Sequence, residues 1–232
     1  GQPHNMPMLR RFMEQRCTLI DYECITDGQG KRLVFFGRYA GLAGMLETLR
    51  GLALRWRMQG LSTPLAELKP AYEYDSLETA QSEVRSIGER IAGHGGGPFR
   101  TSPVIVGFSG YGQVSRGAQE IFDLLPVRTL APQELADAVP YAGFYKTVFT
   151  EENMVEPRTP GAFFSLTDYY QQPKNYVSRF QSYLPFLTAL INGIYWDQRY
   201  PRLVSKKGLR ELAQQGPLRL QIIGDISCDI HG

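Results

Sequence analysis

The sequence has few of the residues that build metal centres and disulfide frameworks. Its 232 residues include three cysteines and three histidines, without a Cys-x-x-Cys pair or a Cys/His cluster of zinc-binding spacing. Cys17, Cys24 and Cys228 are scattered along the chain, which favours free thiols in a reducing compartment. We therefore expect no metal site and a cytoplasmic location.

An excess of one charge and long apolar runs are also missing. The formal net charge is +2 and both signs are interspersed, so neither nucleic acid nor a membrane surface is an expected partner. No stretch approaches the about 20 apolar residues that a membrane-spanning helix requires. The absence of a Gly-x-Ser-x-Gly motif argues against a serine hydrolase. Because the first residue is Gly1 rather than Met, we expect a piece of a longer protein.

The sequence does contain a hydrophobic fraction of 43%, which is enough for a sizeable core. A hairpin is predicted at Asp27-Gly28, followed by a strand over residues 32–37. Apolar side chains that recur every three or four residues predict a long helix over residues 39–60. A second helix is predicted over residues 75–93.

Strands and helices alternate in the pattern from Pro103 onward. Strands are predicted over residues 103–108, 127–130, 144–150, 189–196 and 218–227. Helices are predicted between them, over residues 112–125, from 132, over 167–187 and over 205–214. This alternation predicts an α/β fold, a Rossmann-type doubly wound parallel sheet.

The glycine-rich segment after the first of these strands carries the clearest motif. Residues 110–115 read Gly-Tyr-Gly-Gln-Val-Ser, the Gly-x-Gly-x-x-Gly dinucleotide cradle with serine in the third position. Gly110 would permit the tight turn, Gly112 would let the backbone approach a pyrophosphate, and the helix N-terminus would offer its amides. Small Ser115 and Gly117 would let the helix pack on the strand. The expected cofactor-binding residues of this segment are Gly110, Tyr111, Gly112, Gln113, Val114 and Ser115; the alternative is a tight structural turn.

The next strand bears on the choice of cofactor. A NAD site usually has Asp or Glu about 20 residues beyond the cradle, where it binds the ribose 2′-hydroxyl. Leu130 stands there without a carboxylate beside it, which favours NADP(H) and leaves NAD(H) as the alternative. Arg128 and Arg116 are candidates for the 2′-phosphate, and either could be a solvated charge.

Four segments together resemble a known family. They are residues 19–45, 107–122, 190–205 and 222–230. They are similar to the lysine-ketoglutarate reductase part of the bifunctional aminoadipic semialdehyde synthases, and more loosely to the fungal lysine-forming saccharopine dehydrogenases. Both belong with the alanine dehydrogenase and transhydrogenase fold.

The resemblance implies a reductive condensation of lysine with 2-oxoglutarate to saccharopine, normally with NADPH as the hydride donor. The rest of the bifunctional polypeptide is a further expected partner. The sequence leaves open whether the protein forms a homo-oligomer. In an animal the location would be mitochondrial. The family's catalytic lysine and histidine would lie upstream of Gly1, so this piece should bind cofactor without turnover. The alternatives are another opine- or alanine-type dehydrogenase and a non-catalytic nucleotide-sensing module.

The resemblance also implies site residues near the N-terminus. Arg32 would hold a substrate carboxylate, because a guanidinium can bind a carboxylate at two points. Gln2 and Phe36 would lie near the substrate. Alternatively, Arg32 is an exposed arginine at a strand end, and Phe36 is a core residue.

Further implied residues follow the later strands, at the edge where open α/β sheets bind ligands. Gly193 would lie near the cofactor, and Ile194 and Tyr195 near the substrate. Asp225 and Ser227 would contact the nicotinamide ribose. Core packing is the alternative for Ile194.

The implied domain organisation has four parts. Residues 1–38 would form the edge of a substrate domain, and residues 39–60 an interdomain helix. Residues 61–226 would form the Rossmann domain, and residues 227–232 a segment returning toward the substrate domain.

Overall fold

The computed structural model describes residues 3–94 and 98–227, in two units that divide between Phe36 and Gly37. The first unit holds helix α1 (Met6–Glu14) and a 3₁₀ turn at Tyr22–Cys24. The hairpin expected at Asp27-Gly28 is reduced to one antiparallel bridge between Thr26 and Arg32. The strand predicted over residues 32–37 does not form, because residues 33–36 pair with no strand within the described part of this unit.

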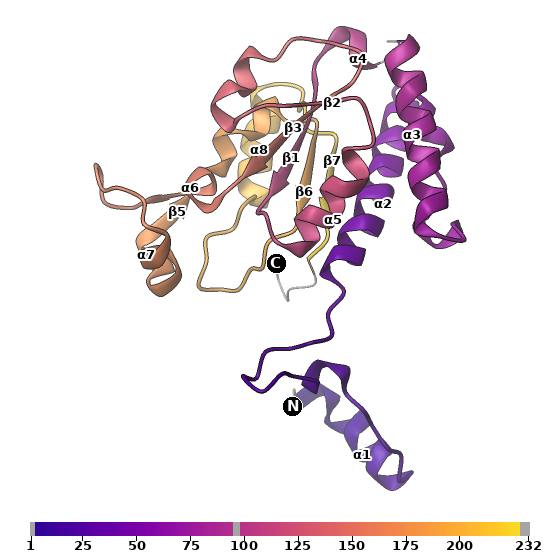
Figure 1. Cartoon of the computed structure of the whole chain (residues 1–232). Coiled ribbons are helices and arrows are strands. Elements are labelled where there is room, and N and C mark those ends of the chain that lie inside the picture. The colour runs from indigo at the N-terminus through magenta and orange to yellow at the C-terminus, as the bar shows by residue number, and fades with distance from the viewer. Residues whose placement is uncertain (1–2, 95–97, 228–232) are drawn as a thin grey trace. The chain divides into compact units, whose positions relative to one another are not determined.

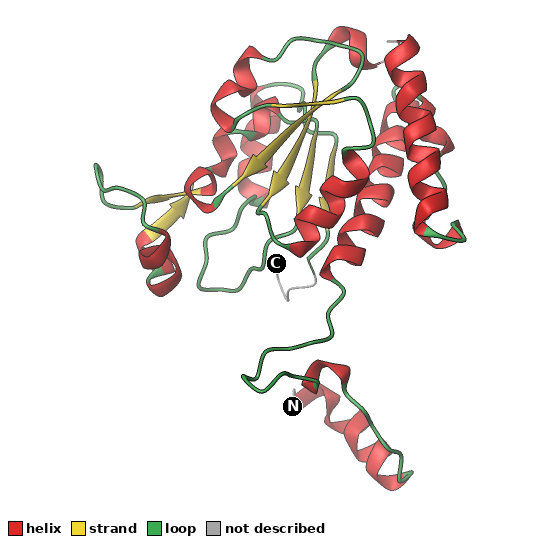
Figure 2. Ribbon diagram, in the orientation of Figure 1, coloured by secondary structure: helices red, strands yellow, loops and turns green. Residues whose placement is uncertain are grey.

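The second unit is built on a parallel sheet, which Figure 2 shows as a fan of arrows. Its strand order is β2-β3-β1-β6-β7, with every neighbouring pair parallel. The six residues of the central strand β1 are all buried, as expected for a strand covered on both faces. The α/β class and the Rossmann-type parallel sheet are therefore confirmed. The five strands are β1 (Val104–Ser109), β2 (Val127–Thr129), β3 (Phe144–Phe149), β6 (Ala189–Asn192) and β7 (Ile222–Asp225).

Helices and turns cover both faces of this sheet (Figure 1). One face packs with Leu49, Ile87 and Ile121 in a first core cluster, and the opposite face packs with Phe180 and Leu187 in a second. The first cluster draws on α2 (Gly37–Met58), α3 (Leu77–His94) and α5 (Gln113–Phe122). The remaining elements are α4 (Pro98–Thr101), α6 (Glu151–Met154), α7 (Leu166–Gln171), α8 (Lys206–Gln215) and a small antiparallel ribbon of β4 (Val155–Pro157) and β5 (Tyr176–Ser178).

The helices α2 and α5 pack backbone against backbone through a pair of glycines. A β-carbon on Gly41 of α2 would overlap the carbonyl oxygen of Val114, and one on Gly117 of α5 would overlap that of Arg38. Gly117 therefore packs its helix against α2, not against the strand as the sequence suggested. Ser115 is fully buried, and its backbone nitrogen lies against Gly193.

Two general properties bear on function. No helix in residues 3–94 and 98–227 is long and apolar enough to cross a membrane. Within the same residues, no group of three His, Cys, Asp or Glu side chains is arranged to hold a metal ion.

Candidate functional site

The candidate site lies where the carboxyl ends of four parallel strands meet. The strand register places Ser109 of β1 beside Phe149 of β3 on one side and Asn192 of β6 on the other. Asn192 in turn pairs with Asp225 of β7. Open α/β sheets bind ligands at this edge, between the loops that leave the strands.

The glycine-rich turn between β1 and α5 has an open backbone at its second glycine. Gly110 has φ +74°, which favours glycine, and its N–H donates to the carbonyl of Phe149 at 2.9 Å. Gly112 precedes α5 with φ −71°, and a β-carbon there would meet no atom within 4 Å. The first N–H groups of α5 have no acceptor within their helix. The open space beside Gly112 and these amides fit a dinucleotide's phosphates.

A chain of hydrogen bonds crosses the sheet edge from β1 to β7. The buried Ser109 hydroxyl donates to Asn192 Oδ1 at 2.9 Å and accepts from the Gly193 N–H at 3.2 Å. Asn192 Nδ2 donates to Asp225 Oδ1 at 3.0 Å. The Ser227 hydroxyl donates to the same oxygen at 2.8 Å. Because these donors fix Oδ1, the exposed Asp225 carboxylate keeps Oδ2 available to accept a ligand hydroxyl.

A pocket of about 280 Å³ opens beside the cradle. Tyr170 donates its hydroxyl to Glu151 Oε1 at 2.6 Å. Burial raises the pKa of Tyr169 to about 12, and the charge of Glu151 raises the pKa of Tyr111. These phenols therefore stay protonated near neutral pH and can donate hydrogen bonds. The pocket is lined by Gly110, Tyr111, Gly112, Glu151, Met154, Tyr169, Tyr170, Gly193, Ile194, Tyr195 and Tyr200.

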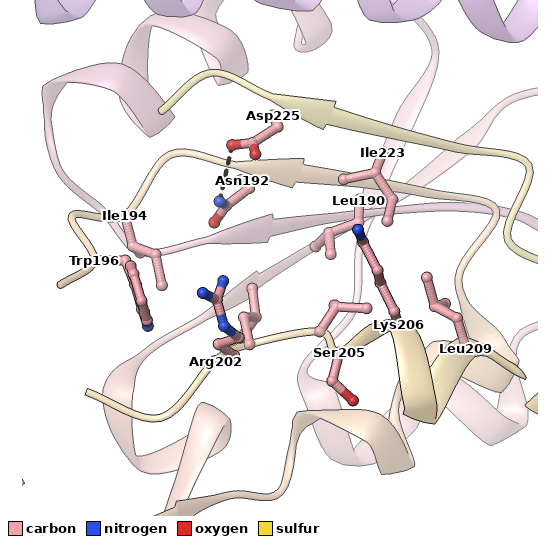
Figure 3. Close-up of a pocket in the computed structure, with 12 residues that line it drawn as sticks. Leu190, Asn192, Ile194, Trp196, Arg202, Ser205, Lys206, Leu209, Ile223 and Asp225 are labelled. Atoms are coloured by element: carbon pink, nitrogen blue, oxygen red, sulfur yellow. Dashed lines mark hydrogen bonds between the residues drawn. The ribbon is translucent and has the colours of Figure 1, made fainter. Parts of the chain in front are cut away.

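A second pocket, of about 170 Å³, lies between strands β6 and β7 and the start of α8 (Figure 3). Ile194 lines both pockets. The Arg202 guanidinium lies 4.1 Å from the centre of the Trp196 ring, and Lys206 also lines the pocket. Leu190, Leu209 and Ile223 form apolar walls, and Asp225 also lines the pocket, so two cations and one carboxylate border a largely apolar space.

The structure brings most of the predicted residues of this unit together. Gln113 and Val114 begin α5 directly after Gly110, Tyr111 and Gly112, and Ser115 follows them. Gly193, Ile194 and Tyr195 line the pocket beside the cradle. The Tyr195 hydroxyl donates to Asp197 at 2.9 Å, and Arg199 holds the pKa of Asp197 below its usual range.

Arg128 and Leu130 lie away from the cradle. Arg128 lies in β2, an edge strand that pairs with β3 and not with β1, and Leu130 directly follows this strand. The Arg128 guanidinium stacks 4.3 Å from the centre of the Tyr141 ring. Leu130 packs against the second core cluster, and Arg116 is exposed on α5.

The residues expected to contact substrate near the N-terminus belong to the first unit. Arg32 forms an ion pair with Glu23 at 3.0 Å, and Phe36 contacts Tyr22 edge to face with ring centres 5.6 Å apart. Gln2 lies outside the described residues.

Five residues at the sheet edge were not predicted from the sequence, among them Lys206 at the start of α8. Ser109 and Asn192 end strands that the sequence predicted, so their positions alone could have identified them. Glu151 follows the predicted strand 144–150 directly, but no motif marks it. Arg202 lies in a loop, and no sequence motif indicates a function for it.

A parallel sheet with a strand, a glycine cradle and a helix at its central switch point defines a Rossmann-type domain. No family model matches the chain. Over its full length, however, the chain is similar to curated proteins named alpha-aminoadipic semialdehyde synthase. It is 40% identical to the protein of Arabidopsis thaliana, of which it covers 23%, and 35% identical to the mitochondrial proteins of Rattus norvegicus and Bos taurus, of which it covers 27%. The chain is thus related to a part of these synthases and spans about a quarter of their length.

Proposed function

We propose that the chain is the cofactor-binding part of a lysine-ketoglutarate reductase, an oxidoreductase that uses a nicotinamide dinucleotide. The reaction would condense the ε-amine of lysine with the keto group of 2-oxoglutarate, release water and reduce the resulting imine to saccharopine. The observation that carries this proposal is the cradle between β1 and α5, in a chain related throughout to alpha-aminoadipic semialdehyde synthases.

The residues at the sheet edge would bind and orient the reactants. Amides at the start of α5 would hold the pyrophosphate beside Gly112, and Asp225 would accept a hydroxyl of the nicotinamide ribose. The cofactor supplies the hydride when bound. Arg202 and Lys206, at the second pocket, would attract the carboxylates of the substrate and so set its orientation.

Several expectations belong to this proposal. The catalytic lysine and histidine would be supplied by the rest of the bifunctional polypeptide, with Arg32 and Phe36 at the substrate. Residues 1–38 would form the edge of a substrate domain, 39–60 would connect the domains, and 61–226 would hold the cofactor. The return segment expected over residues 227–232 lies outside the described residues from 228 onward. The location would be cytoplasmic, or mitochondrial in an animal.

The proposed reaction is tested by measuring whether its product changes the affinity of the chain for the dinucleotide. Saccharopine should tighten the binding of the oxidised dinucleotide by about tenfold, because product and cofactor would share one site and favour each other there. Calorimetric titration of the dinucleotide with and without saccharopine measures this effect, and alanine serves as the control. Coupling to alanine instead would indicate an alanine-type dehydrogenase. Dinucleotide binding that no amino acid affects would indicate a nucleotide-sensing module.

A further inference from the structure

The strand order gives β3 the place beside the cradle. In the usual Rossmann order, the strand that follows the cradle helix lies next to the first strand, and its end approaches the adenosine ribose. Here β3 pairs with β1 along its whole length, from Val104↔Phe144 to Ser109↔Phe149. The N–H of Gly110 donates to the Phe149 carbonyl. The residues after Phe149 therefore occupy the place of the usual ribose-binding carboxylate.

Glu151 stands in that place with its side chain held in position. It is the first residue of α6, directly after Thr150, and it is half-buried. The Tyr170 hydroxyl donates to its Oε1 at 2.6 Å. Glu151 lines the same pocket as Gly110 and Gly112, so its carboxylate borders the space that a dinucleotide in the cradle would occupy.

The charges at this pocket disfavour an additional phosphate. Among the described residues that line it, Glu151 is the one charged side chain, and the others are glycines, tyrosines, Met154 and Ile194. Of the two arginines considered for a 2′-phosphate, Arg128 stacks on Tyr141, and Arg116, exposed in the first turn of α5, does not line the pocket. A 2′-phosphate in this pocket would thus meet a carboxylate, with no cation among the described residues that line it.

We propose that Glu151 determines which nicotinamide dinucleotide the chain binds, by accepting a hydrogen bond from the adenosine ribose and repelling a 2′-phosphate. The chain then prefers NAD(H) to NADP(H). This inference rests on the proposed function only in placing a dinucleotide in the cradle. Leu130, at the spacing that favoured NADP(H), follows β2, whereas Glu151 follows β3, the strand that pairs with β1.

The preference is measured by calorimetric titration with NADH and with NADPH. We expect the wild-type chain to bind NADH at least about tenfold more tightly, because like charges brought together oppose binding of the second dinucleotide. Glu151→Gln keeps an acceptor for Tyr170 and for a ribose hydroxyl but removes the charge. It should reduce the preference by about tenfold, mainly through tighter binding of NADPH.

The neighbouring Glu152→Gln is the matched control, since Glu152 is exposed and does not line the pocket. It should leave the preference unchanged. The inference would be overturned if the wild-type chain preferred NADPH, or if Glu151→Gln left the ratio of the NADH and NADPH affinities unchanged. A clear preference for NADH without linkage to saccharopine would instead contradict the proposed reaction and still support the role of Glu151.

Discussion

Gly41→Ala is expected to destabilise the second unit by about 3 kcal/mol or more. An added methyl group would overlap the backbone of Val114 and Ala118 in α5. Backbone atoms of a packed helix cannot rotate away as a side chain can, so the two helices would have to separate. Overpacking of a core typically costs about 1–3 kcal/mol, and a clash with backbone belongs at the upper end of this range or above it.

Gly51→Ala on the same helix is the matched control. There the new methyl group would meet the tip of the Ile222 side chain, which can change its rotamer, and alanine favours a helix over glycine by about 1 kcal/mol. The free energy of unfolding of this variant, measured with urea, should lie within about 1 kcal/mol of the wild-type value. If the two substitutions lowered the free energy of unfolding by the same amount, the backbone contact between α2 and α5 would be contradicted.

Gly112→Leu should abolish dinucleotide binding while the chain stays folded. The backbone of Gly112 suits any residue at φ −71°, and no atom lies within 4 Å of a β-carbon added there. The leucine side chain would therefore fill the space assigned to the pyrophosphate. We expect affinity to fall by at least about 100-fold, because direct phosphate contacts to the helix amides would be lost.

Calorimetry of the Gly112→Leu variant measures this loss, and its melting temperature should stay near the wild-type value. Gly28→Leu serves as the control, because Gly28 also has no atom within 4 Å of an added β-carbon and lies in the first unit. If Gly112→Leu bound dinucleotide as wild type does, the cradle would be a structural turn only.

The elements that local pattern determines could be predicted from the sequence. The helix predicted over residues 39–60 appears as α2 (Gly37–Met58), because its apolar side chains repeat with the helical period. The strand and helix around the cradle also form as predicted. The helix predicted over 167–187 is wrong beyond α7 (Leu166–Gln171). Pro173 begins one short 3₁₀ turn there, and Pro185 is the second residue of another. A continuous helix is interrupted at these positions because proline removes a helical hydrogen bond.

Strand order could not be predicted, since it depends on contacts between distant segments. The structure nevertheless shows a physical basis for this order. The three residues of β2 are partly or fully exposed, as suits an edge strand, whereas β3 has six residues, most of them buried. A longer, more apolar strand belongs nearer the centre of a parallel sheet.

The dependence on contacts between distant segments also explains which site residues could be predicted from the sequence. The cradle and Asp225 follow from motifs and strand ends, which local sequence shows. Glu151 is 41 residues beyond Gly110 (151 − 110), and only the pairing of β3 with β1 brings it to the cradle. A fixed spacing of about 20 residues beyond the cradle reaches β2, which pairs with β3 and not with β1.

Hydrogen–deuterium exchange with and without saturating NADH most directly tests whether the sheet edge is a dinucleotide site. The expected result is slower exchange of the amides of residues 110–115, together with those of residues 151–154 and 192–195, because a bound dinucleotide would cover the cradle and the ends of β3 and β6. Exchange should stay unchanged in α3, none of whose described residues lines either pocket. Binding of NADH with protection elsewhere and none at residues 110–115 would contradict the assignment.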